Sequence, residues 1–242
     1  MIKTREIEKI LVFIVVVFLG SVNVALAVPT LQLYSPDATY FDEYYVDDEY
    51  VITESWFIYS NSFDLQVLGA DQPNAVTHIE NVKLHFAVPE RYFVSDGFIH
   101  IMGEGLDKTI DYTEMIYGQP DEVTQPHGIY PYAYYYSVEL PDLMVSTAGE
   151  TIYDYNPEET DLGQDNGDIQ YYRVTYGGYF LIHMDLTGTA VSVDKKGNVT
   201  YYEEFAPFSH DADAVVPEPA TMLLVGTGLI GLGWTARRKF KK

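Results

Sequence analysis

Three glycines near the C-terminus, Gly226, Gly228 and Gly231, have the G-x-G-x-x-G spacing that lets a dinucleotide-binding backbone approach a pyrophosphate. That chemistry needs a strand before the glycines, a full helix after them and an acidic residue about 20 positions further on. The preceding residues read VPEPA, only eight residues follow Trp234, and none of the eight is acidic. We therefore reject a nucleotide loop and look for another role for this apolar segment.

The spacing of histidine, serine and aspartate residues elsewhere in the chain does not identify a catalytic site. Ser209-His210-Asp211 contains the residue types of a hydrolase triad, but triad members converge from separate segments. His183 and Asp185 have the spacing to share one face of a strand, either in a metal site or on an exposed polar face. None of the six histidines forms a short metal-binding spacing with another.

Acidic clusters are better candidates for binding a cation, because calcium prefers carboxylate oxygens. Residues 158–168, EETDLGQDNGD, place Asp161, Asp165 and Asp168 around an expected Asn166-Gly167 turn, where the three carboxylates could converge on one calcium ion. The segment does not match the D-x-[DN]-x-[DN]-G loop pattern, and a solvated acidic loop is the alternative. Calcium is the one cofactor that the sequence suggests.

Tyrosines are concentrated in residues 129–140, IYPYAYYYSVEL, where Tyr132, Tyr134 and Tyr136 would share one strand face. Aromatic rings beside acidic groups can stack on sugars, but tyrosine also packs well in any sheet. A saccharide-binding face and ordinary sheet packing therefore both stay open. Nothing selects the pair of carboxylates that a glycan hydrolase would need.

Strands must position these side chains, because no window of helical length shows a sustained 3.6-residue period. Residues 82–88, VKLHFAV, and residues 179–186, YFLIHMDL, alternate in hydrophobicity with period two. Turn signals occur at 166–167, 177–178 and 196–198. Further candidate strands cover residues 31–34, 51–59, 63–68, 98–102, 132–138, 170–176, 190–193 and 199–202. We predict an all-β body over residues 28–215, an antiparallel β-sandwich of jelly-roll-like type.

This body is strongly acidic. The whole chain has 14 Lys and Arg against 36 Asp and Glu. Residues 1–27 hold three of the basic and two of the acidic residues, and residues 216–242 hold five and one, which leaves 6 basic and 33 acidic residues and a net charge of −27. Such a charge excludes nucleic acid as a partner, because phosphate contacts need Lys and Arg. The absence of cysteine excludes disulfides and thiolate chemistry.

The N-terminus has the order of a secretory signal peptide. Lys3, Arg5 and Lys9 precede the apolar residues 10–19, ILVFIVVVFL, and the small-residue site Ala25-Leu26-Ala27 follows. We predict that residues 1–27 are removed, so that the mature chain begins at Val28. A permanent N-terminal anchor is the alternative, although the apolar segment is short for a membrane span.

The C-terminus has the composition of a membrane anchor. Residues 220–236 carry no charge, and five basic residues lie within 237–242. Seventeen helical residues span about 25 Å, the short end of what crosses a bilayer, and basic residues favour the cytoplasmic side. Glycines in such a helix permit close packing. We predict one membrane helix over residues 220–236.

The tail also resembles a known sorting signal. Pro217-Glu218-Pro219, an apolar helix and a basic cluster, together residues 216–242, are similar to the PEP-CTERM signal of exopolysaccharide-producing bacteria. The resemblance implies that exosortase, a membrane processing enzyme, reads Pro217, Glu218 and Pro219 as substrate residues.

Segments of the body resemble the choice-of-anchor proteins, N type. The similar segments are LQLYSPDATYF at 31–41, SFDLQVLGA at 62–70, IENVKLHFAVP at 79–89 and FAPFSHDA at 205–212. This resemblance implies an exported body and no particular activity.

Together these features predict an exported surface or extracellular-matrix protein without catalytic activity. It would be anchored in the inner membrane before exosortase processing, and would then have a structural or adhesive role near exopolysaccharide. A calcium- or saccharide-binding module is the alternative, and a glycan hydrolase is the third possibility.

Overall fold

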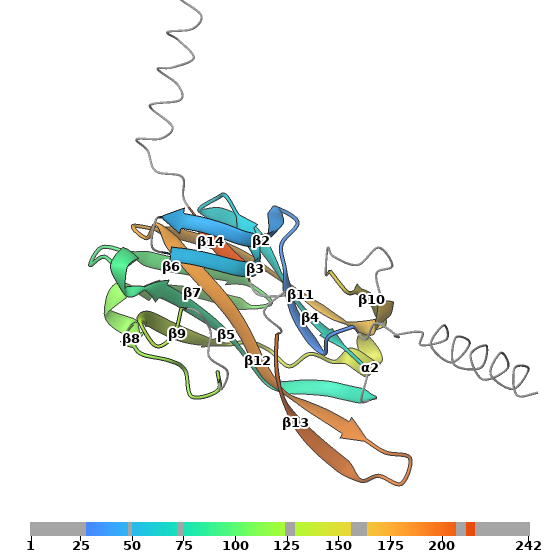
Figure 1. Ribbon diagram of the computed structural model, residues 1–242. Helices are drawn as coiled ribbons and strands as arrows, with labels where there is room; N and C mark the ends of the chain where they lie inside the picture. The colour runs from blue at the N-terminus through green and yellow to red at the C-terminus, as the bar shows by residue number, and fades with distance from the viewer. Residues whose placement is uncertain are drawn as a thin grey trace, which may run out of the picture.

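The computed structural model describes residues 28–47, 50–71, 75–123, 129–155, 164–206 and 212–215. These residues form two sheets, together with short helical turns (Figure 1). The strands are β1 (Leu31–Tyr34), β2 (Ala38–Asp47), β3 (Tyr50–Ile58), β4 (Ser62–Ala70), β5 (Val76–Pro89), β6 (Phe98–Gly103), β7 (Leu106–Asp111), β8 (Ile116–Tyr117), β9 (Ala133–Glu139), β10 (Glu150–Tyr153), β11 (Gln164–Gly177), β12 (Leu181–Val193), β13 (Val199–Phe205) and β14 (Ala212–Val215). The helical turns are η1 (Glu90–Tyr92), η2 (Tyr112–Glu114) and α2 (Val145–Ala148).

One sheet has the order β1-β4-β11-β6-β7, with β10 also paired to β11. The other has the order β2-β3-β14-β12-β5-β9-β8, with β13 also paired to β12. Neighbouring strands are antiparallel except β14 and β3, which are parallel. The prediction of an all-β body made of antiparallel sheets is confirmed, and its jelly-roll-like connectivity stays a prediction. In the described part of the chain no helix has the length and apolarity to cross a membrane, and residues 220–236 lie outside that part.

The main core lies between the two sheets, as the alternating pattern predicts. Val82, Leu84 and Phe86 of β5 face Phe63 and Leu65 of β4 in one hydrophobic cluster. These side chains are fully buried. Alternation along a strand puts every second residue on the inner face, which is why period-two hydrophobicity located these strands correctly.

The face of β12 that points away from the main core is buried, although an exposed polar face was one of the two expectations for it. Both faces of this strand are buried from Leu181 to Val191. Ile129 and Tyr130 belong to a second hydrophobic cluster, with Ala87 of the neighbouring strand β5, on the outer side of the sheet. His183 and Asp185 therefore lie inside the protein, and the expectation of an exposed polar face is wrong.

Two of the three expected turns are confirmed. Gly178 follows β11 with a positive φ of 80°, and Gly197 closes the β12–β13 hairpin with a φ of 84°. This hairpin extends as an arm beyond the packed sheets (Figure 1). The expected Asn166-Gly167 turn is wrong, because both residues lie inside β11 and pair with β10.

Candidate functional site

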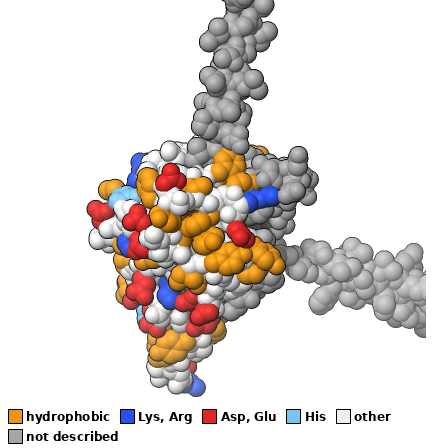
Figure 2. Space-filling view, turned by 90° about the vertical axis from the view of Figure 1, so that its left-hand side faces the viewer, with side chains coloured by type: hydrophobic (Ala, Val, Ile, Leu, Met, Phe, Trp, Pro, Cys, Tyr) orange, Lys and Arg blue, Asp and Glu red, His pale blue; other side chains and the backbone are white. Residues whose placement is uncertain are grey.

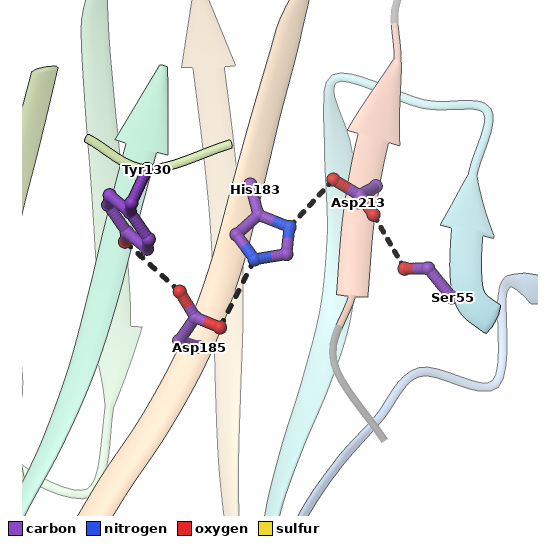
Figure 3. A network of polar contacts seen from close by, with 5 residues as sticks. All are labelled: Ser55, Tyr130, His183, Asp185 and Asp213. Atoms are coloured by element: carbon purple, nitrogen blue, oxygen red, sulfur yellow. Dashed lines mark hydrogen bonds and ion pairs between the residues drawn. The ribbon is translucent and has the colours of Figure 1, made fainter. Parts of the chain in front are cut away.

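A chain of buried polar side chains crosses three neighbouring strands of the larger sheet, β12, β14 and β3, and reaches the segment before β9 (Figure 3). His183 lies between two carboxylates: its Nε2 is 3.1 Å from Asp185 Oδ1 and its Nδ1 is 2.9 Å from Asp213 Oδ1. The Tyr130 hydroxyl donates to Asp185 Oδ2 at 3.0 Å, and the Ser55 hydroxyl donates to Asp213 Oδ2 at 2.5 Å. All five residues are buried. We call this set the His183 network.

Strand register explains why these residues meet. Asp185 is two positions after His183 on β12, so both side chains point to the same face. His183 is paired with Asp213 of β14, and β14 runs beside β3, which contributes Ser55. Tyr130 reaches the same face from the segment before β9.

The network holds a protonated histidine. A carboxylate only accepts hydrogen bonds, so a ring between two carboxylates donates from both nitrogens and carries a positive charge. Burial alone lowers the pKa of His183, but Asp185 and Asp213 outweigh burial and hold the pKa well above its usual value. Two carboxylates and one imidazolium leave one net negative charge, which the Tyr130 and Ser55 hydroxyls solvate.

A second buried histidine on the same face, His85, is uncharged because its partners are hydroxyls and not carboxylates. His85 Nδ1 lies 2.8 Å from the Ser137 hydroxyl, and its Nε2 lies 2.8 Å from the Thr187 hydroxyl. Hydroxyls both donate and accept, so a neutral ring satisfies both contacts. Burial lowers the pKa of His85 to about 4, although Asp185 opposes this shift. His85 is therefore neutral at pH 7.

This arrangement does not match hydrolase or metal chemistry. Ser55 donates to Asp213 and not to His183, so among the described histidines none is shown to take its proton as a triad base would. Asp185 and Asp213 bind opposite nitrogens of the ring and do not converge on one point. No group of three or more potential ligands with metal-binding geometry occurs among the described residues.

The calcium candidates are separated in the described structure. Asp165 and Asp168 are three positions apart on β11 and so point to opposite faces. Asp168 Oδ2 accepts the Met144 N–H at 2.6 Å, and Asp165 Oδ1 accepts the Asn166 N–H at 2.8 Å. Asp161 lies outside the described residues.

Most residues with an expected role in signal-peptide cleavage or exosortase processing lie outside the described part of the chain. Ala25, Ala27, Pro217, Glu218 and Pro219 belong to the residues that are not described, and so does Ser209-His210-Asp211. Val28, the expected first residue of the mature chain, is buried against Leu68, Ala70 and Ile152. Signal-peptide cleavage and PEP recognition stay predictions.

The expected tyrosine face divides between core and surface. Tyr134 and Tyr136 pack against the main core, and Tyr134 stacks on Phe93 with ring centroids 3.8 Å apart. Tyr132 is 70 % exposed. Sheet packing thus accounts for Tyr134 and Tyr136.

A different aromatic group, which the sequence did not indicate, lies on the smaller sheet. Tyr34 and Tyr155 stack with centroids 3.8 Å apart, and Tyr153 lies 6.4 Å from Tyr155. Burial raises the pKa of Tyr155, and the nearby hydroxyls of Tyr34, Tyr153 and Tyr171 raise it further. These four tyrosines come from β1, β10, β11 and the residues after β10, so no local window of sequence brings them together.

Sequence reasoning also missed Ser55, Tyr130 and Asp213. Asp213 did carry a signal, since it stands within the apolar sequence ADAV of residues 212–215. A charge on a short apolar strand requires a buried partner. Finding that partner requires the register between β14 and β12, which only the fold supplies.

Comparison with known protein families gives a match for the C-terminal tail. Residues 215–239 match the family model described as the PEP-CTERM protein-sorting motif. The resemblance of the tail to the PEP-CTERM sorting signal is thereby confirmed, and the match indicates a protein that exosortase sorts to the cell surface. The membrane helix over residues 220–236 stays a prediction.

The comparisons are less informative for the body. No curated protein matches the chain significantly, and no comparison supports the resemblance to the choice-of-anchor proteins. A solved structure titled "AvmM Catalyzes Macrocyclization in Alchivemycin A Biosynthesis" is 8 % identical and covers 74 % of this chain and 95 % of its own. Its TM-score of 0.28 carries no argument about fold or function.

Proposed function

We propose that this chain is a non-catalytic structural or adhesive protein of the cell surface or extracellular matrix. Residues 1–27 direct export, and residues 220–236 hold the precursor in the inner membrane until exosortase acts at Pro217-Glu218-Pro219. The observation that carries this proposal is the sorting-motif match at residues 215–239, which begins at the last residue of β14.

The described geometry supports a structural role for the body. Every member of the His183 network is buried, and each polar atom described above has a partner within the protein. Such a network fixes the register between β3, β14 and β12 and the position of Tyr130 above them. A buried charge set of this kind is best attested as a device for structural specificity.

Sorting can be tested by comparing three tail variants in the host. Changing Pro217, Glu218 and Pro219 to alanine should preserve membrane insertion but block processing, so that uncleaved precursor accumulates in the inner membrane. Leu229→Arg should impair insertion, at a cost of about 3 kcal/mol near the centre of a span. Leu229→Ile is the matched control and should be sorted normally. Fractionation and blotting give the readout, and normal processing of the PEP variant would refute the proposal.

The second candidate function is saccharide binding by the tyrosine group of the smaller sheet. Tyr153 and Tyr171 are 41 % and 52 % exposed beside the Tyr34–Tyr155 stack, and aromatic rings with hydroxyl rims suit sugar rings. Exopolysaccharide is the proposed partner. Tyr153→Ala with Tyr171→Ala should reduce co-sedimentation of the protein with host polysaccharide. Tyr201→Ala on β13 is the control, and equal retention of both variants would contradict this function.

A further inference from the structure

The body ends very close to its membrane segment. Val215 is the last residue of β14, a strand held between β3 and β12, and its side chain is buried. Only residues 216–219 separate it from the apolar segment 220–236. Four fully extended residues reach at most about 14 Å. If the segment spans the bilayer, the end of the body where β14 leaves must therefore lie near the lipid surface.

Aromatic side chains surround this exit point. Val215 belongs to one hydrophobic cluster with Phe57, Leu181, Phe41, Tyr92 and Phe180. The Tyr92 and Phe180 rings are 5.2 Å apart, and Tyr59, the residue after β3, lies 6.4 Å from Phe57. The cluster thus connects the buried end of β14 with rings at the surface.

Several apolar side chains at this end are exposed to solvent. Tyr59 is 44 % exposed, and Val94, two residues after Tyr92, is 37 % exposed. Phe98, which pairs with Gly177 at the end of β11, is 38 % exposed. We call Tyr59, Tyr92, Val94, Phe98 and Phe180 the exit face. On the face shown in the space-filling view, hydrophobic side chains gather in patches with separate carboxylates between them (Figure 2).

The charges at this end argue against electrostatic attraction to anionic lipid. The Arg91 guanidinium lies 5.8 Å above the Tyr92 ring, while Glu90 and Asp96 are exposed nearby. The body as a whole carries −27, so anionic headgroups would repel it. Contact with a membrane would depend on the aromatic rings, which favour the headgroup region of a bilayer.

We propose that the exit face rests on the lipid headgroup region of the membrane while the C-terminal segment anchors the precursor. This inference rests on the proposed function, because it requires residues 220–236 to be in the bilayer. The partner is the zwitterionic surface of a phospholipid bilayer. The contact fixes the orientation of the body above the membrane and holds residues 217–219 at the interface, where a membrane enzyme can reach them.

The absence of cysteine allows a direct test with single labels. Tyr59→Cys and Val94→Cys are made in the full chain, reconstituted in phosphatidylcholine vesicles and labelled with an environment-sensitive fluorophore. Tyr171→Cys and Tyr201→Cys are controls of equal or greater exposure. Tyr201 pairs with Val191, ten positions along β12 from Leu181, or about 33 Å from the exit end. Leu229→Cys reports on the membrane segment itself.

Labels at positions 59 and 94 should show a blue shift and should lose intensity when the vesicles contain quencher-bearing lipids. Labels at 171 and 201 should behave as in water. If the label at 229 is quenched by lipid but those at 59 and 94 are not, this inference fails while the anchor proposal stands. A shielded label at 59 without lipid quenching indicates a protein contact and also overturns it. A water-exposed label at 229 overturns both proposals.

Discussion

At the scale of residues, hydrogen-bond partners decide the charge of the two buried histidines. His85 and His183 lie on the same face of one sheet and are both buried. Hydroxyls surround the ring of His85, whereas carboxylates surround the ring of His183. Burial lowers both pKa values, and only the carboxylates of Asp185 and Asp213 reverse that effect.

The His183 network should therefore stabilise the protein most at low pH. A histidine whose pKa is raised in the folded state contributes stability that is fully present below its unfolded pKa, about 6.5. That contribution is lost as the pH rises from there through the higher folded pKa. We expect the difference in unfolding free energy between wild type and His183→Gln to shrink from pH 6 to pH 9. Urea titrations at each pH measure it, and a constant difference would contradict a charged His183.

His85→Gln provides a control with the opposite sign. The pKa of His85 is lowered to about 4 in the folded state, so its contribution is present above pH 6.5 and is lost as the pH falls toward 4. The shift corresponds to on the order of 3 kcal/mol. The advantage of wild type over His85→Gln should decline on acidification, whereas the advantage over His183→Gln should not.

Two buried tyrosines on β11 make a matched pair. The Tyr172 hydroxyl donates to Gln170 Oε1 at 2.8 Å, whereas the buried Tyr176 hydroxyl has no hydrogen-bond partner within the described structure. Removing an unsatisfied buried hydroxyl leaves stability unchanged or raises it, whereas breaking a satisfied bond costs about 1 kcal/mol. Tyr176→Phe should therefore be at least as stable as wild type, and Tyr172→Phe should be less stable. Thermal unfolding of both variants tests this, and a clear loss in Tyr176→Phe would reveal a partner for its hydroxyl.

At the scale of elements, hydrophobic alternation was a reliable guide only where one face meets the core. It located β5 and β12, because Val82, Leu84 and Phe86 and their counterparts face the other sheet. It could not indicate that the outer face of β12 is also buried. At His183 and Asp185 that burial involves Tyr130, which is distant in sequence and whose hydroxyl donates to Asp185.

The Asn166-Gly167 pair shows how a tertiary contact overrides a local turn signal. Gly167 pairs with both Glu150 and Ala70, so β11 continues through it between two neighbours. A Cβ at this position would lie 2.0 Å from the backbone oxygen of Gly69. The glycine is thus required by close strand packing, a reason that composition alone cannot distinguish from a turn. The same error placed Asp165 and Asp168 around a turn that does not exist.

At the scale of the whole molecule, the C-terminal sorting motif was easier to identify from sequence than the contacts in the interior. Export and sorting signals are read as linear order of charge, apolarity and small residues, so the motif at residues 215–239 needed no fold. The His183 network and the tyrosine group on the smaller sheet combine residues from separate strands. Only strand register brings such residues together.

The net charge of −27 gives a final prediction about divalent cations. Repulsion among 33 acidic residues destabilises the folded body, so calcium should raise its melting temperature at low salt. Because Asp165 and Asp168 face opposite sides of β11, we expect magnesium to give the same shift. We also expect 0.5 M potassium chloride to abolish both shifts, since the Debye length falls from about 10 Å at 0.1 M to about 3 Å at 1 M. Differential scanning fluorimetry of the mature chain tests this. A calcium-specific shift that persists in high salt and disappears in Asp161→Asn would contradict general screening and establish a site around Asp161.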